Sequence, residues 1–299
     1  AMKCGQRDCI THLTFCPFEI GESVGFPTEY QVVVANSFVM AKKSAGAKDQ
    51  FNQRVACYEF GFMMVRHLFP QYRERLNYLK DLNAEHLQVL PSKIYEILLA
   101  IPERMTSEEL HAALPEYREQ INRIQKSHAI PAFYELRSVI LYGIAECARA
   151  ERCLTLMKAR DYETLGTLMN ISHNGDRVYQ NGEPYDYAVS DEMLLKLITD
   201  LRSEDAARVA SAQIYYQPGG YACSTREIDE MVDFINAQPG VVGSELSGAG
   251  LGGCIIILVR TAQTQALLDT LQHSYYTPKG LPMGAQVFIP VAGSQVLNF

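Results

Sequence analysis

The feature that most constrains this fold is a glycine-rich segment that leads directly into a run of β-branched residues. Glycines stand at positions 248, 250, 252 and 253, and residues 254–259 read Cys-Ile-Ile-Ile-Leu-Val. The spacing matches GxGxxG, but a dinucleotide fingerprint must open a helix, whereas a β-branched run is typical of a strand. No P-loop lysine follows the glycines. The segment therefore predicts a loop between two strands, and a Rossmann or P-loop site is disfavoured.

The same loop is a candidate binding site. Without a Cβ atom the backbone can approach a ligand closely, and successive N–H groups can line an anion. The alternative is a tight turn that only reverses the chain. A plain hairpin needs only one or two glycines, so we favour the ligand-facing loop.

The elements around this loop predict the fold class. Residues 224–227 form a capping box, and an apolar stripe follows at Ile228, Met231, Val232 and Ile235. A strand begins at 241, another covers 254–260, a helix covers 262–275, and further strands are predicted near 285–290 and 295–299. This order predicts an α+β fold, a ferredoxin-like split β-α-β sandwich with helices on one face of the sheet.

The first two thirds of the chain are predicted to be mainly helical. Strands are expected at 10–20 and 30–40, followed by a helix from Asp49 that ends before Pro70. From about 75 to 175 helical patterns dominate, with long ones at 131–158 and 161–172. Residues 176–220 are turn-rich and aromatic, and we interpret them as an excursion from the core rather than a domain.

Composition excludes several classes of protein. With 299 residues the chain is long enough for about two domains, and 27 Lys and Arg against 34 Asp and Glu give a net charge of -7. This balance argues against a nucleic-acid partner, which needs a basic surface. No apolar run reaches the roughly 20 residues that cross a bilayer, and residues 1–5 lack a signal-peptide pattern. We predict a cytoplasmic protein without a membrane partner.

The cysteines and histidines do not predict a metal site. The eight cysteines form no CxxC pair, and buried reduced thiols are the favoured interpretation. Cys4, Cys9, His12 and Cys16 could be zinc ligands, but on a strand Cys9 would point away from His12 and Cys16, so zinc is the lesser alternative. His173 is isolated, and we interpret it as a packing or capping residue.

Four segments together resemble the C-terminal half of a galactokinase-type GHMP kinase. Val32–Ser37 is similar to the family's strand that ends in Asn-Ser, and Asp49–Arg54 is similar to its helix start with an aromatic residue, Asn and Arg. Gly166–His173 resembles the Leu-Met-x-x-Ser-His segment. Ser224–Asp229, leading to 248–254, resembles the third, glycine-rich motif.

The resemblance implies roles for particular residues. Gly248 and Gly250 would bind substrate together with Phe51, which stands where galactokinases usually place a tyrosine. The nucleotide would contact a second set: Lys42, Lys43, Ser44, Gly252 and Gly253. For Lys42 and Lys43 a solvated basic loop is an equal alternative. A complete relative would use ATP and Mg²⁺, neither of which we expect to be tightly bound here.

Other family motifs are not found in the sequence. The phosphate loop Pro-x-x-x-Gly-Leu-Ser-Ser-Ser and the sugar-binding Glu-His-x-Asp segment are absent from these 299 residues. Asp8 imitates the spacing of the family's catalytic aspartate, but the next strand follows too soon, so we leave the catalytic residues unassigned. We expect residues 1–70 to be a remnant of an N-terminal kinase domain. Residues 71–299 would form the C-terminal domain, with an insertion at about 176–220.

These features favour one function and leave an alternative open. The favoured hypothesis is the C-terminal portion of an ATP-dependent sugar kinase, acting on C1 of galactose or a related sugar and inactive as this chain alone. The alternative is a non-catalytic sugar- or protein-binding module. Either hypothesis allows self-association or an N-terminal half chain as partner.

Overall fold

The computed structural model describes residues 4–15, 17–40 and 45–293. Cys16, Lys42, Lys43, Ser44 and the strand expected at 295–299 therefore lie outside the described residues.

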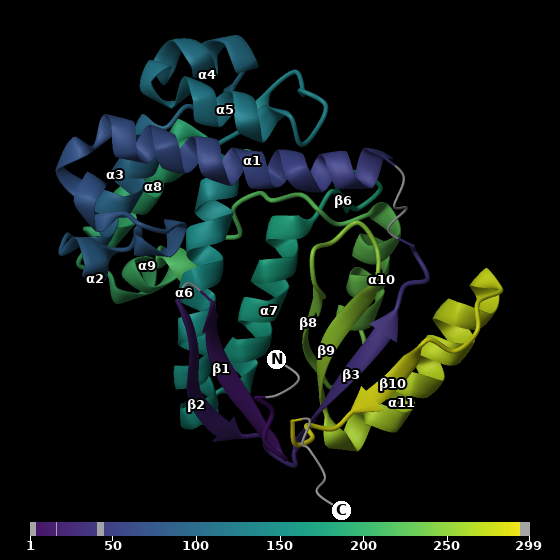
Figure 1. Ribbon diagram of the computed structural model, residues 1–299. Helices are drawn as coiled ribbons and strands as arrows, with labels where there is room; N and C mark the ends of the chain where they lie inside the picture. The colour runs from purple at the N-terminus through teal and green to yellow at the C-terminus, as the bar shows by residue number, and fades with distance from the viewer. Residues whose placement is uncertain (1–3, 16, 41–44, 294–299) are drawn as a thin grey trace, which may run out of the picture.

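The strands and helices follow one another along the chain as shown in Figure 1. The strands are β1 Cys9–Phe15, β2 Phe18–Gly25, β3 Tyr30–Asn36, β4 Arg104–Met105, β5 Tyr134–Glu135, β6 Tyr179–Gln180, β7 Glu183–Pro184, β8 Val241–Leu246, β9 Cys254–Arg260 and β10 Ala285–Phe288. The α-helices are α1 Ala45–Leu68, α2 Ala84–Leu87, α3 Pro91–Ala100, α4 Ser107–Ala113, α5 Arg118–Gln125, α6 Arg137–Ala159, α7 Tyr162–Asp176, α8 Asp191–Leu201, α9 Ala206–Ser211, α10 Arg226–Asn236 and α11 Thr264–Thr270. A π-helical turn, Leu271–Tyr276, extends α11.

The main sheet has four strands in the order β10-β3-β9-β8, and every neighbouring pair is antiparallel. The register of β3 on β9 runs from Tyr30 opposite Arg260 to Asn36 opposite Cys254. The α+β class and the order α10-β8-β9-α11-β10 are thereby confirmed. A domain boundary near residue 70 stays a prediction, and in the structure β3 shares its sheet with strands from the end of the chain.

Helices α10 and α11 cover one face of this sheet. The apolar stripe Ile228, Met231, Val232 and Ile235 is fully buried against the inward-facing residues of β3 and β9. Helix α10 begins one residue later than the predicted capping box. Thr225, not Ser224, is the N-cap residue, and its hydroxyl accepts a hydrogen bond from the Ile228 amide.

The opposite face is not open, which corrects the expectation of helices on one face only. Helix α7 packs against β8, and Tyr162, Leu165 and Leu168 form a third apolar cluster with Leu258 of β9. The approach is close because both elements present a glycine: a Cβ on Gly243 would lie 2.2 Å from the Gly166 carbonyl oxygen. The sheet is therefore covered on both faces.

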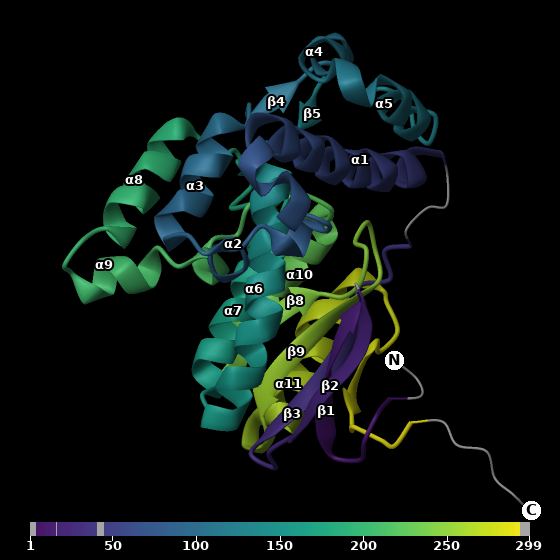
Figure 2. The ribbon, with the colours of Figure 1, turned by 60° about the vertical axis from the view of Figure 1, so that its left-hand side comes forward.

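The helical body forms a separate, larger core around α1, α3, α6 and α8 (Figure 2). Helix α1 ends at Leu68, before Pro70 as predicted, and the predicted helices at 131–158 and 161–172 correspond to α6 and α7. The segment 176–220 belongs to this core, because α8 packs against α3 and buries Leu194. It is therefore not an excursion from the core.

The predicted strand at 10–20 is wrong in its length. β1 and β2 form an antiparallel hairpin in which Phe15 pairs with Phe18, so the chain reverses where a continuous strand was expected. Both rings are exposed, by 70% and 55% of their surface. Of the helices in the described ranges, none is long and apolar enough to cross a membrane. Within those ranges no three His, Cys, Asp or Glu side chains converge as metal ligands.

Candidate functional site: the glycine loop between β8 and β9

The loop 247–253 joins β8 to β9 at the end of the sheet that faces α1 (Figure 1). Its backbone is left-handed at several positions, with φ of +82° at Gly248 and Gly250, +63° at Leu251 and +101° at Gly253. Side-chain-bearing residues avoid this region. The glycines are thus needed for the path of the loop, and a single tight turn does not account for it.

Backbone hydrogen bonds to two other segments hold the loop in place. The Leu251 amide donates to the Cys223 carbonyl oxygen at 2.6 Å, and the Gly253 amide donates to the Val39 carbonyl oxygen at 3.0 Å. Ser37, at the exit of β3, donates from both its amide and its hydroxyl to the Gly253 carbonyl oxygen. The loop is therefore fixed by neighbouring backbone rather than by packing on its own side chains.

Segment 221–224, which anchors the loop, is itself held by the end of α7. The amides of Tyr221 and Ala222 donate to the Gly175 carbonyl oxygen, and the Ser224 amide donates to the Asp176 carbonyl oxygen. Gly250 must be glycine here, because a Cβ would lie 2.1 Å from the Cys223 carbonyl oxygen. A chain of backbone contacts thus runs from α7 through 221–224 to the glycine loop.

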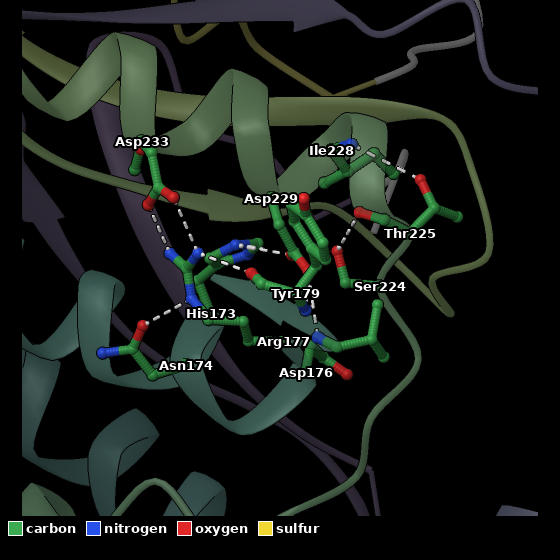
Figure 3. Close-up of polar contacts among 12 residues, drawn as sticks. His173, Asn174, Asp176, Arg177, Tyr179, Ser224, Thr225, Ile228, Asp229 and Asp233 are labelled. Carbon is green, nitrogen blue, oxygen red and sulfur yellow. Dashed lines mark hydrogen bonds and ion pairs between the residues drawn. The ribbon is translucent and has the colours of Figure 1, made fainter. Parts of the chain in front are cut away.

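A buried polar network locks the end of α7 to α10 (Figure 3). The Asp229 carboxylate accepts hydrogen bonds from the Val178 and Tyr179 amides. Arg177 forms a bidentate pair with Asp233, at 3.0 and 2.7 Å. His173 Nε2 lies 3.2 Å from Asp229 Oδ1, and neither atom completes a well-aligned hydrogen bond within the described residues. Burial lowers the pKa of His173, so its ring is neutral at pH 7. Its burial is consistent with the predicted packing role.

Two carboxyl groups behind the loop have strongly raised pKa values. Burial raises the pKa of Asp176 to about 7, opposed by the hydrogen bond that Tyr142 donates to it. Burial together with the negative charge of Glu146 raises the pKa of Glu245 to about 8. Because folding disfavours their charged forms, these two groups make the stability of the structure around the loop depend on pH.

The loop offers amides for an anion. Within the described ranges, the amides of Gly248, Ala249, Gly250 and Gly252 donate no backbone hydrogen bond. A Cβ on Gly248 or Gly253 would meet no atom within 4 Å, so the space beside the loop is open. Phosphate oxygens fit such a row of donors. The described residues offer no matching carboxylate cluster for Mg²⁺, so no magnesium ligand is assigned.

Of the other residues considered from the sequence, Phe51 lies on the helix that contacts the loop's anchoring segment, whereas Asp8 lies far from the loop. Phe51 lies half-buried in the second turn of α1, and its neighbour Gln50 donates to the Ala222 carbonyl oxygen at 3.3 Å. The N-terminal end of α1 is thereby tied to the segment that anchors the loop. Asp8 lies elsewhere: its carbonyl oxygen bonds the Phe26 amide, before β3 begins. The seven residues of β3, at about 3.3 Å each, separate it from the loop by roughly 20 Å. This agrees with leaving Asp8 unassigned.

Sequence reasoning missed the residues that position the loop. Ser37 and Asn36 were noted only as the end of a strand. In the structure the Ser37 hydroxyl also accepts from the Val39 amide, and the Asn36 side chain accepts from the Phe38 amide, which shapes the turn after β3. An Asn-Ser pair at the end of a buried strand is a signal for such turn bonding. Cys223 acts through its carbonyl oxygen, which no sequence signal reveals.

Comparison with known proteins relates this arrangement to a family. Residues 197–277, which contain the loop, match the model of the GHMP kinases C terminal domain. The galactokinase of Exiguobacterium sibiricum is 28% identical over 141 residues, which cover 47% of this chain and 26% of that protein. The galactokinase of Enterococcus faecalis is 25% identical over 214 residues, which cover 66% of this chain and 46% of that protein.

The chain carries a GHMP kinase C-terminal domain over residues 197–277 and is similar to galactokinases. It spans only about a quarter to a half of the length of these two galactokinases. A solved structure, Lactococcus lactis galactokinase complexed with galactose, aligns with 97% of the chain and 52% of its own length, at 18% identity and a TM-score of 0.48. The matched C-terminal domain carries α10, β8, the glycine loop and β9.

Proposed function

We propose that the glycine loop forms one wall of the nucleotide and sugar site of an ATP-dependent sugar kinase. The observation that carries the proposal is the row of amides at 248–250 and 252, which have no hydrogen-bond partner in the described backbone. Hydrogen bonds from the loop to Cys223, Val39 and Ser37 hold this row in place. The family of the chain supports the reaction class. The substrate we propose is galactose or a related sugar, phosphorylated at C1.

The loop suits phosphoryl transfer because that reaction depends on positioning and on stabilising charge. An oxygen of the sugar bonds to the γ-phosphorus of ATP, the bond from this phosphorus to the bridging oxygen breaks to release ADP, and the hydroxyl proton passes to a base. Donors fixed at Gly248 and Gly250 would orient phosphate oxygens without reorganising. Phe51, at the N-terminal end of α1, would contact the sugar.

We further propose that the 299-residue polypeptide has no kinase turnover by itself. Its sequence contains no Pro-x-x-x-Gly-Leu-Ser-Ser-Ser phosphate loop, and Asp8 lies at the far end of β3 from the glycine loop. The phosphate cradle and the base would come from residues outside these 299, for instance from an N-terminal half chain.

The test measures ADP release with ATP, Mg²⁺ and a panel of hexoses. The chain is assayed alone and after mixing with the N-terminal half of the Enterococcus faecalis galactokinase. We expect no turnover alone and galactose-dependent turnover in the mixture, abolished by Gly248→Asp. Turnover by the chain alone would refute the proposed inactivity. Sugar binding that never leads to turnover in the mixture would favour the non-catalytic module.

A further inference from the structure

A second polar site lies along α1 and shares no lining residue with the glycine loop. An open hollow of about 810 Å³ is bounded by α1, α5 and the turn Pro70–Arg75 with the residues just after it. Its size is that of a small-ligand site. Among its lining residues are three arginines, Arg66, Arg73 and Arg123.

These arginines have no carboxylate partner among the described residues. Eight other arginines pair with acids: Arg137, Arg149, Arg160, Arg177, Arg202, Arg208, Arg226 and Arg260. Isolated arginines such as Arg152 make no ion pair with a described residue either, so the hollow differs in gathering three unpaired arginines around one space. Arg66 Nε is buried and meets no acceptor in the described part of the chain. A buried donor without an acceptor is unfavourable, so water or a ligand must satisfy this N–H group.

Aromatic rings hold two of the guanidinium groups in place. Arg73 donates to the Tyr117 hydroxyl at 2.8 Å and lies 5.8 Å from the centre of that ring. Arg66 lies 6.0 Å from the centre of the Phe62 ring. These contacts leave most of the N–H groups free while limiting the motion of the charges. The hollow is therefore preorganised for an anion.

The acidic groups nearby do not cancel this charge. Glu59 is the single carboxylate in the lining, against three arginines, although the chain as a whole carries a charge of -7. Glu116, next to Tyr117, contacts His67 at 2.6 Å rather than an arginine. A local excess of positive charge on an acidic protein attracts and retains anions.

We propose that this hollow binds a phosphate monoester carried on a small ring-bearing molecule. Arginine forks match phosphate oxygens in a bidentate manner, which a compact ammonium cannot do. Phe62, Tyr78 and Tyr117 provide apolar surface for the ring of a sugar or a nucleoside. The proposal does not rest on the kinase reaction, because neither Phe51 nor any residue of the glycine loop lines the hollow.

Calorimetric titration of the full chain at low salt tests this site. The probes are inorganic phosphate, a hexose 6-phosphate, adenosine monophosphate and unphosphorylated glucose. We expect one of the two esters to bind more tightly than inorganic phosphate, and glucose not to bind. The two esters distinguish a sugar from a nucleoside as carrier. The proposal is overturned if no phosphorylated probe binds at about 10 mM. A dissociation constant of that size corresponds to a binding free energy of only about 3 kcal/mol.

Variants locate the binding. Arg66→Ala and Arg73→Ala should each weaken the ester by about tenfold or more, and Arg66→Lys should recover part of the loss. Glu59→Gln should tighten binding about twofold to fivefold, because it removes the repelling charge. The matched control is Arg152→Ala, which removes an exposed arginine on α6 that lies over the Tyr215 ring and makes no hydrogen bond or ion pair with a described residue. It should leave the affinity unchanged.

A gain of affinity cannot result from misfolding, so Glu59→Gln keeps the test valid if an arginine variant is unstable. Loss of binding in Gly248→Asp together with unchanged binding in Arg66→Ala would assign the phosphate to the glycine loop and overturn the proposal. The reverse pattern supports the hollow whether or not the chain is part of a kinase.

Discussion

The two candidate anion sites of this protein are built from different atoms, and Arg66 of the hollow lies toward the opposite end of α1 from Phe51. The glycine loop presents backbone amides near Phe51, whereas the hollow presents the guanidinium groups of Arg66 and Arg73. Fifteen residues at about 1.5 Å each put roughly 22 Å between Phe51 and Arg66. One site is defined by the path of the chain, and the other by side chains on helical surfaces.

This difference predicts how each site responds to mutation. A site made of amides requires particular φ values and close contacts, so a change to it also disturbs the fold. A site made of arginine side chains can lose its function while the helices that carry it remain stable. The predictions below test that contrast, from the largest expected effect on unfolding to the smallest.

Gly250→Ala should have the largest effect. The new Cβ would lie 2.1 Å from the Cys223 carbonyl oxygen, at a φ of +82°. We expect a loss of about 3 kcal/mol or more in the free energy of unfolding, measured with urea. Gly248→Ala is the matched control, since it has the same φ but open space, and it should lose only about 1 kcal/mol. Equal losses would mean that contact with Cys223 does not fix the loop.

Asp176→Asn should make the free energy of unfolding less dependent on pH. The Asp176 pKa is about 7 in the folded protein against 3.8 for an ordinary aspartate, so the folded state binds more protons between these values. Its contribution to stability is complete below pH 4 and is lost as the pH rises through 7. The variant should therefore gain roughly 1–3 kcal/mol at pH 8 and nothing at pH 4.

The measurement is the free energy of unfolding across this pH range. Asp186→Asn, an exposed aspartate that likewise accepts a backbone hydrogen bond, serves as control and should show no gain at pH 8. A gain of the same size at pH 4 and pH 8 would show that titration of Asp176 is not the cause.

Ser37→Ala should have an intermediate effect. Ser37 is only 5% exposed. The substitution removes its hydroxyl, which donates to the Gly253 carbonyl oxygen and accepts from the Val39 amide. We expect a loss of about 1–2 kcal/mol and faster hydrogen exchange at the Gly253 amide. Ser211→Ala, which removes one exposed hydrogen bond on α9, should lose only a few tenths of a kcal/mol. No difference between the two serines would argue against the anchoring role of Ser37.

Arg66→Ala should have the smallest effect on folding. Arg66 makes no ion pair with a described residue and leaves its buried Nε unsatisfied, so its removal should change the free energy of unfolding by no more than about 0.5 kcal/mol. The urea midpoint measures this effect. A loss comparable to that of Gly250→Ala would show that the guanidinium supports the helical body and is not reserved for a ligand.

Local sequence patterns correctly predicted much of the fold. The period-3.6 stripe from Ile228 to Ile235 and the β-branched run in β9 predicted α10 and β9, and the burial of both agrees. Patterns failed where apolar residues continue on both sides of a turn, although Pro17 stands at the reversal between β1 and β2. Strand 10–20 was predicted as continuous, although Phe15 pairs back onto Phe18. The segment 176–220 was misjudged because its apolar residues are buried by α3, far away in the sequence.

The sequence by itself determined that residues 248–253 form a loop between two strands, because the glycines lead directly into a β-branched run. It also fixed the order of helices and strands around that loop. Only the tertiary structure decided that β3 lies between β9 and β10, that the Cys223 carbonyl oxygen holds the loop, and that three arginines share one hollow. These are contacts between residues distant in the chain. Local periodicity and turn chemistry carry no information about which distant surfaces meet, since burial and long-range pairing decide that together.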